Sequence, residues 1–144
     1  MLRRARAYWD EKRAGRAMPS RADIDPVDIP DLLPFVILID IMPPGRRLRV
    51  RLAGTEICNR FGMDYTGLFL DEIDFGDVRE KILADYGRAA RSSVPYFTAH
   101  RFRKSDRDFY YNIERGIFPL SSDGRRPDKL LAVLDFEPTD EFEC

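Results

Sequence analysis

The chain has very few residues of the kinds that hold metals or form disulfide frameworks. Its 144 residues include one histidine, His100, and two cysteines, Cys58 in the middle and Cys144 at the end. Two cysteines so far apart do not make a disulfide scaffold, and with a single histidine they match no known spacing of a zinc site. The sequence therefore predicts a fold that depends on packing, with no bound metal ion.

Long apolar runs are also missing. The longest, residues 35–39, has the length of a strand, whereas a helix that crosses a bilayer needs about 18 apolar residues or more. The first residues, MLRRAR, turn polar again at residue 10 and lack the apolar stretch of a secretory signal. We expect a cytoplasmic protein that makes no contact with a membrane.

A strong net charge is absent, although the two ends differ in sign. The chain carries 24 basic and 25 acidic side chains, a balance that argues against binding of nucleic acid through bulk charge. Residues 1–22 hold seven basic and two acidic side chains, and residues 135–144 hold five acidic ones and no basic ones. The basic end could be an arm for nucleic acid or acidic lipid, or the solvated face of a helix. We favour the second interpretation and expect no nucleic-acid partner.

The common catalytic and nucleotide-binding motifs are missing too. The sequence has no glycine-rich phosphate loop, no dinucleotide fingerprint and no nucleophile elbow. The cluster Asp71, Glu72 and Asp74 could supply paired carboxylates for acid–base chemistry, but adjacent acids in a polar connection usually face water. We therefore predict that the chain is not an enzyme. A small enzyme that uses pocket carboxylates and tyrosines is the alternative.

What the chain does have is enough apolar residues for one core. It is 44% hydrophobic and 34% charged, as expected for one globular domain. Residues 2–17 show the spacing of an amphipathic helix, whose apolar face carries Leu2, Ala5, Tyr8 and Trp9. This face either docks on its own domain or packs against a second subunit. The prolines between residues 19 and 34 then predict an extended segment.

The rest of the chain alternates between strand and helix patterns. Strands are expected at residues 35–41, 47–52, 96–103, 109–119 and 130–136, and helices at 55–61 and 77–91. In the second strand, Leu48, Val50 and Leu52 alternate with three arginines, which predicts one buried and one exposed face. This order predicts an α+β fold with a five-stranded antiparallel sheet, helices on one face and an N-terminal helical extension.

The same order resembles the PAS sensory domain, and several short segments are similar to PAS motifs. Residues 59–67 (NRFGMDYTG) and 70–73 (LDEI) look like the PAS helical stretch in which a phenylalanine–glycine turn precedes a second glycine. Residues 102–107 resemble the polar hairpin between the third and fourth strands, and residues 119–124 resemble the exit from the fourth strand. Asp135 is the one residue kept of the Asp-Ile-Thr signature with which many PAS domains end.

The block before residue 35 resembles a bacterial subgroup of short stand-alone PAS proteins. On this resemblance the chain divides into an N-terminal helix and proline-rich segment (1–34), a PAS-like domain (35–137) and an acidic C-terminal tail (138–144).

The resemblance implies a pocket between the sheet and the short helices, which in PAS proteins holds haem, flavin, a small metabolite or only side chains. The candidate pocket residues are Phe61, Tyr65, Tyr86, His100 and Tyr111. Photochemical flavin binding needs the order Asn-Cys-Arg-Phe, whereas residues 58–61 read Cys-Asn-Arg-Phe. The family's haem ligand is usually a histidine on the long helix, and residues 77–91 contain none. We expect neither cofactor, and the identity of a ligand stays open.

These observations predict a stand-alone sensory or regulatory module that signals through protein–protein interaction. We expect a homodimer formed through the N-terminal helix, a separate signalling protein as the output, and a small-molecule ligand that shifts the population of two conformers. The chain ends soon after its last strand, which favours an output on another chain. The homodimer predicts that removal of residues 1–18 abolishes self-association. The alternatives are the small enzyme and nucleic-acid binding through the basic helix.

Overall fold

The structure, a computed structural model, describes residues 1–103 and 110–138. Its strands are β1 (Val36–Met42), β2 (Arg47–Ala53), β3 (Tyr96–Arg103), β4 (Tyr110–Leu120) and β5 (Lys129–Pro138). Its α-helices are α1 (Leu2–Arg13), α2 (Thr55–Phe61) and α3 (Arg79–Ala89). Short 3-10 helices are η1 (Arg21–Asp23), η2 (Pro26–Asp28), η3 (Leu33–Phe35), η4 (Leu70–Glu72) and η5 (Gly76–Val78). The expected acidic tail after residue 138, and most of the polar hairpin at residues 102–107, lie outside the described residues.

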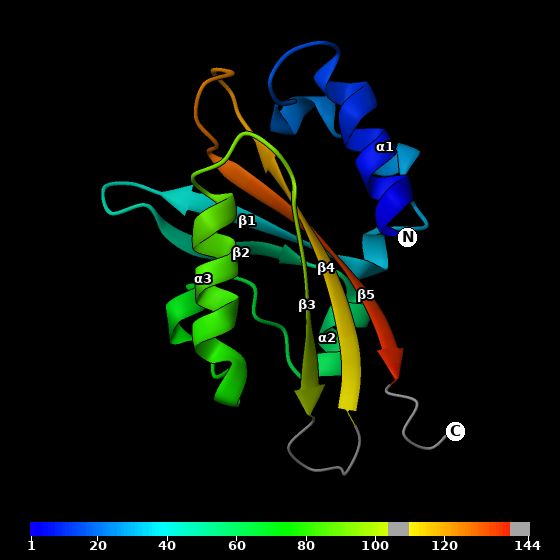
Figure 1. Ribbon diagram of the computed structural model, residues 1–144, viewed down its shortest axis with the longest axis vertical. Helices are drawn as coiled ribbons and strands as arrows, with labels where there is room; N and C mark the ends of the chain where they lie inside the picture. Colours follow the sequence, from blue (N-terminus) through cyan, green and yellow to red (C-terminus); the bar gives the residue numbers. More distant parts are fainter. Residues whose placement is uncertain (104–109, 139–144) are drawn as a thin grey trace.

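The strands form one antiparallel sheet in the order β2-β1-β5-β4-β3 (Figure 1). Strands that follow one another along the chain pair with each other, except β2 and β3, which lie at opposite edges; β5 lies at the centre between β4 and β1. The arrangement confirms the predicted α+β fold with five antiparallel strands. It leaves β2 and β3 as the edges and β5 as the central strand.

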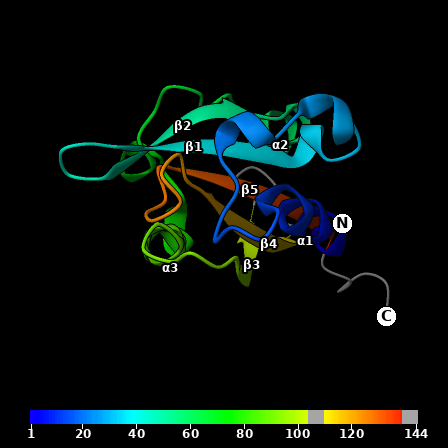
Figure 2. The same ribbon diagram turned by 90° about the horizontal axis from the view of Figure 1, so that it is seen from above.

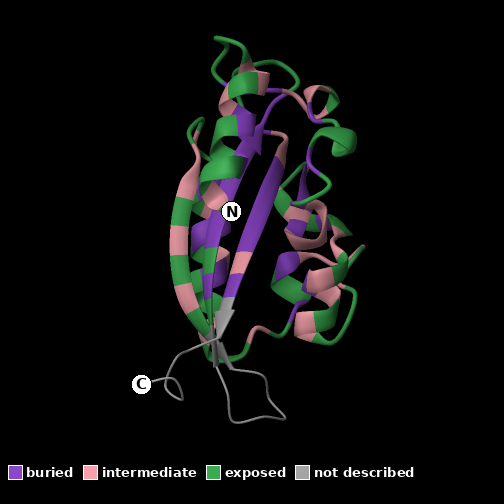
Figure 3. Ribbon diagram, turned by 90° about the vertical axis from the view of Figure 1, so that its right-hand side faces the viewer, coloured by how far each residue is buried: buried purple, intermediate pink, exposed green. Residues whose placement is uncertain are grey.

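Both faces of the sheet are covered by other parts of the chain. On one side, here called the inner face, the sheet packs against α2, η4 and α3. On the outer face it packs against α1 and the 3-10 helices of the N-terminal segment. Figure 2 shows α1 and α3 on opposite sides of the sheet, and Figure 3 shows that the central strands are buried along much of their length. The helices expected on one face are therefore α2 and α3, and the N-terminal extension covers the other.

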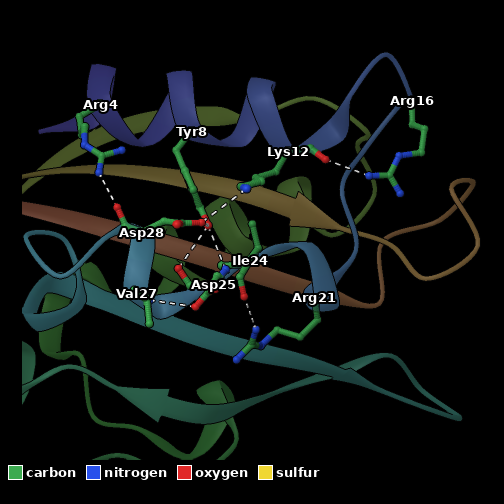
Figure 4. Close-up of polar contacts among 9 residues, drawn as sticks. All are labelled: Arg4, Tyr8, Lys12, Arg16, Arg21, Ile24, Asp25, Val27 and Asp28. Atoms are coloured by element: carbon green, nitrogen blue, oxygen red, sulfur yellow. Dashed lines mark hydrogen bonds and ion pairs between the residues drawn. The ribbon is translucent and has the colours of Figure 1, made fainter.

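Helix α1 is held on the outer face by its two aromatic residues. The Trp9 side chain is 3% exposed, and its indole Nε1 donates a hydrogen bond of 2.8 Å to the carbonyl oxygen of Pro119 in β4. The Tyr8 hydroxyl accepts from the backbone N–H of Asp25 at 2.9 Å and donates to Oδ2 of Asp28 at 3.0 Å (Figure 4). These contacts tie the helix to β4 and to the segment that follows it.

All four residues expected at a dimer interface lie against their own chain. Ala5, Tyr8 and Trp9 are buried in the outer core, and Leu2 packs at its margin. Of the two placements left open for this apolar face, the structure shows docking on its own domain. Self-association, and the part of Leu2, Ala5, Tyr8 and Trp9 in it, stays a prediction.

The structure corrects the expected face of one residue in β2. The register shifts between Leu38 and Ile39 of β1, so that Leu38 pairs with Leu52 while Ile39 pairs with Val50. An extra residue on one strand reverses the facing of the residues beyond it. Val50 is accordingly 2% exposed in the inner core, whereas Leu52 is 48% exposed. The uninterrupted alternation predicted for this strand is wrong at Leu52.

The two layers meet at Gly54, immediately before α2. The backbone N–H of Gly54 donates to the carbonyl oxygen of Val36 at 2.8 Å. A Cβ atom at this position would collide with the carbonyl oxygens of Leu33 and Pro34. The absence of a side chain therefore lets the first residues of α2 rest on η3, which belongs to the N-terminal segment.

No helix in the described ranges is long and apolar enough to cross a membrane.

Replacement of Trp9 by alanine tests the docking of α1. We expect the free energy of unfolding to fall by about 3–5 kcal/mol, because a large buried side chain is lost together with its hydrogen bond to Pro119. Urea denaturation followed by circular dichroism measures the change. Glu11→Ala, at an exposed position of the same helix, is the matched control and should change stability by less than about 0.5 kcal/mol. A Trp9→Ala variant as stable as the control would contradict the docking.

Candidate functional site

A small enclosed cavity lies between the inner face of the sheet and the helices that cover it. Its free volume is about 20 Å³, close to the space that one water molecule needs. Nearly all of its lining is aliphatic or aromatic. The sheet contributes Ile37, Val50, Ala53, Arg115 and Leu134, and the helical layer contributes Ile57, Phe61, Tyr65, Leu70, Ile73, Phe75, Ile82 and Tyr86.

Three of the five residues expected at a pocket line this cavity. Phe61 ends α2, Tyr65 lies in the loop that follows, and Tyr86 lies in α3. His100 lies on β3 and is not part of the lining, and the side chain of Tyr111 in β4 lies outside the described residues. A ligand-binding role for these residues stays a prediction.

The cavity also contains Arg115, which the sequence interpretation missed. Arg115 lies on β4 between Ile113 and Ile117 and is 2% exposed. Its guanidinium carbon lies 5.1 Å from the ring centre of Tyr86, within the range of a cation–π contact. Its Nε and Nη1 atoms are buried and have no hydrogen-bond partner in the parts of the chain that the structure describes. Because buried charged groups are normally paired, two free donors on a buried guanidinium indicate a site.

The buried carboxylates of the described region are engaged with other groups. In α3, Asp85 accepts from Lys81 Nζ at 3.1 Å and from the Thr98 hydroxyl at 3.0 Å. In β1, Asp40 accepts from Lys129 Nζ at 2.8 Å. Neither carboxylate forms an ion pair with Arg115, so the charge in the cavity is not neutralised by an acid of the described residues.

His100 lies close enough to the Arg115 guanidinium to be affected by its charge. Its two ring nitrogens are buried without a hydrogen-bond partner in the described part of the chain. The pKa of His100 is lowered to about 4, mainly by burial and to a smaller extent by the positive charges of Arg115 and Lys81, while Asp85 opposes the shift. His100 is therefore uncharged at neutral pH. It supplies no negative charge to Arg115 and no second positive charge to the site.

The acidic cluster between the helices is not part of the cavity. Asp71, Glu72 and Asp74 are all exposed. Asp71 accepts two hydrogen bonds from Arg47, at 2.6 and 3.0 Å, and these lower the pKa of its carboxyl group. Glu72 and Asp74 accept backbone N–H groups of their own turns at 3.0 and 2.9 Å. The alternative that these acids are pocket carboxylates is wrong.

Most of the basic side chains of α1 and the turn after it are neutralised within the N-terminal segment. Arg4 lies 3.4 Å from Asp31, Lys12 lies 3.4 Å from Asp28, and Arg16 lies 2.8 Å from Asp23. Figure 4 shows several of these basic side chains and the 3-10 turns beneath the helix. Residues 1–34 contain seven basic and six acidic side chains, a net charge of +1. This pairing favours the interpretation of the basic pattern as a helix face.

The cavity does not fit a photochemical flavin. Cys58 lies in α2 outside the cavity lining, and its thiol Sγ faces the carbonyl oxygen of Ala53 at 3.9 Å. Burial raises the pKa of this thiol, which disfavours the reactive thiolate. In the described residues no group of three or more His, Cys, Asp or Glu side chains could hold a metal ion.

Comparison with known proteins identifies the family to which this fold and site belong. A family model described as a PAS domain matches residues 1–135. The chain therefore belongs to the PAS domain family, and the match includes the N-terminal segment that covers the outer face. No curated protein matches the chain significantly.

Solved structures agree on the fold. The LOV protein of Rhodobacter sphaeroides has a TM-score of 0.56 at 15% identity, over 78% of this chain and 68% of that one. The LOV domain of Aureochrome1 has a TM-score of 0.54 at 11% identity, over 81% and 91% of the two chains. A PAS domain from Colwellia psychrerythraea has a TM-score of 0.54 at 10% identity, over 76% and 94%. At these identities the likeness concerns the fold alone.

The buried environment of His100 predicts a lowered pKa of its imidazole ring in the folded protein. Because it is the only histidine of the chain, its ring protons can be followed by NMR without further assignment. We expect an apparent pKa of about 4 in the folded protein and about 6.5 in urea. Between these values the unfolded chain binds the extra proton, so this group lowers stability as the pH falls from about 6.5 to about 4. A folded-state pKa at or above 6.5 would contradict the burial beside Arg115.

Proposed function

We propose that the chain is a sensory or regulatory PAS module whose input is a small molecule in the inner cavity and whose output is an interaction with another protein. Membership of the PAS family and the position of the cavity between sheet and helices support this proposal. The observation that carries it is Arg115, because a buried guanidinium with two free donors lacks the partner that such a group requires. A cytoplasmic location is part of the same proposal.

The structure offers a route from the cavity to the outer layer. Ile57 and Phe61 of α2 form part of the cavity wall. The same helix begins after Gly54, which lies against the carbonyl oxygens of Leu33 and Pro34. A ligand that moves α2 would therefore displace η3 and, through it, the segment that holds α1. Binding changes the output only if the ligand prefers one of the two arrangements.

Self-association belongs to this proposal as well, and the docking of α1 changes how it should be tested. Removal of residues 1–18 would uncover outer-core residues such as Phe118 and Leu131. A change in self-association of the truncated chain could then result from this newly exposed apolar surface and would not test the dimer interface. Sedimentation velocity of the intact chain over a range of concentrations is the appropriate measurement, and a monomer at every concentration would refute the homodimer.

Hydrogen–deuterium exchange tests the route from input to output. A ligand is first found by native mass spectrometry of freshly purified protein or by a thermal-shift screen of metabolites. With the ligand bound, we expect slower exchange in α2 and changed exchange in η3 and α1, because the layers meet at Gly54. Exchange that changes only around the cavity would contradict the proposed output, and a protein that binds no small molecule would contradict the proposed input.

A pair of matched variants places the ligand in the cavity. Ala53 lines the cavity, and Ala53→Ile adds a branched side chain that fills it. Ala99→Ile makes the same change at an exposed position of β3. We expect ligand affinity to fall at least about tenfold in Ala53→Ile, since little free volume is left, and to stay unchanged in Ala99→Ile. Equal affinities in both variants would place the ligand elsewhere.

A further inference from the structure

We propose that Arg115 binds the carboxylate of a small monocarboxylic acid whose apolar chain lies in the inner cavity. This inference rests on the proposed function, because it names the chemical class of the ligand for the same cavity. It depends on three observations: the free donors of the guanidinium, the composition of the walls, and the aromatic side chains that close the site.

The guanidinium requires an anion. Arg115 is 2% exposed, and its Nε and Nη1 atoms, which lie on either side of Nη2 in the planar group, have no hydrogen-bond partner among the described residues. A carboxylate can form a bidentate pair with Nε and Nη2 or with Nη1 and Nη2, so an anion at either edge would satisfy one of the free donors. The buried acids Asp85 and Asp40 are held by Lys81 and Lys129. A negative charge from outside the described chain therefore fits the site best.

The walls favour a monoanion with a hydrocarbon chain. Besides Arg115, the lining consists of aliphatic and aromatic side chains together with the hydroxyl-bearing Tyr65 and Tyr86. Burial raises the pKa of Tyr86, so its hydroxyl stays protonated. A phosphate or dicarboxylate carries charge that one guanidinium cannot balance, and the surplus would be buried without a partner. An aliphatic chain, in contrast, gains by leaving water for such walls.

The closed cavity limits the length of that chain. Its volume of about 20 Å³ admits little more than one water molecule. Three aromatic side chains of the lining, Phe61, Tyr65 and Phe75, are only partly buried. Rotation of one of them toward solvent would vacate room for a few carbons. The neighbouring wall is made of η4 and η5, each three residues long, and such short elements open locally at low cost. The ligand is therefore a short-chain carboxylate.

The test compares acids with their neutral analogues by calorimetry at neutral pH. Butanoate, hexanoate and octanoate are titrated into the full chain, and hexanamide and sodium chloride serve as the uncharged and halide controls. We expect saturable binding of at least one acid and none of hexanamide. Arg115→Met, which keeps the length of the side chain and removes its charge and donors, should weaken binding by about 10- to 100-fold, the worth of charge-assisted hydrogen bonds.

Two controls distinguish a loss of carboxylate binding by Arg115 from a loss of the folded structure. Arg125→Met makes the same change on an exposed turn and should bind the acid as the unchanged chain does. Arg115→Met should fold, because replacement of a buried unpaired charge by an apolar side chain is neutral or stabilising. If Arg115→Met does not fold, the His100 ring signals of the unchanged chain give the readout. A carboxylate bound beside Arg115 at neutral pH shifts these signals, and unchanged signals under saturating acid overturn the proposal.

The outcomes also distinguish this inference from the proposed function. Equal binding of hexanoate and hexanamide, or undiminished binding by Arg115→Met, overturns the carboxylate anchor but leaves a ligand-sensing cavity in place. Stabilisation by chloride with no binding of any acid overturns the inference in favour of a simple halide site. Binding of an acid through Arg115 without any change in exchange at α1 supports the inference and contradicts the proposed output.

Discussion

The burial of the central strand on both faces is the constraint on which this structure depends. Leu130, Ala132 and Leu134 of β5 contribute to the inner core, and Leu131 and Val133 contribute to the outer core; each is at most 8% exposed. A sheet with an apolar pattern on both sides needs a layer on each. The helices between β2 and β3 cover one side. The N-terminal segment has to cover the other, which is why α1 and the turns after it form part of the folded domain.

Charged side chains form ion pairs in the outer layer, whereas the inner layer contains a guanidinium group that is unpaired within the described residues. In the outer layer, basic side chains of α1 lie beside aspartates of the 3-10 turns, for example Lys12 and Asp28 at 3.4 Å. These pairs are partly exposed, and each contributes little stability. In the inner layer, Arg115 is enclosed and forms no ion pair with an acid of residues 1–103 or 110–138. A charge in that position costs stability in the empty protein, and proteins accept such costs most often where a site needs the group.

The sequence was sufficient to predict the architecture. Strand periodicity located β3 at residues 96–103, and the order of elements led to the five-stranded sheet and the resemblance to PAS domains. The partner of the apolar face of α1 could not be decided, because hydrophobic spacing shows that a surface is buried but not what buries it. The exposure of Leu52 followed from a register shift against β1, which depends on pairing between strands and leaves no trace in the alternation of β2.

The site was less predictable than the fold. Of the aromatic residues expected at a pocket, Phe61 and Tyr65 lie on either side of Gly62 and line the cavity, while their role in ligand binding stays a prediction. Arg115 was missed although the alternation of β4 places it on the same face as Ile113 and Ile117. An arginine in a strand usually reaches water, and only the three-dimensional cover of α3 shows that this one does not. Conversely, the close spacing of the acids at 71–74 suggested paired catalytic carboxylates. In the structure each of them stabilises a local turn or forms a surface ion pair.

One consequence of the outer layer is spectroscopic. Trp9 is the only tryptophan of the chain, and it is held in the outer core by the carbonyl oxygen of Pro119. Its fluorescence therefore reports on one place alone, the seam between α1 and β4. The cavity, in contrast, is surrounded by tyrosine and phenylalanine. Tyrosine is present on both sides of the sheet, whereas the single tryptophan lies in the outer layer, so selective excitation of tryptophan monitors that layer without an added label.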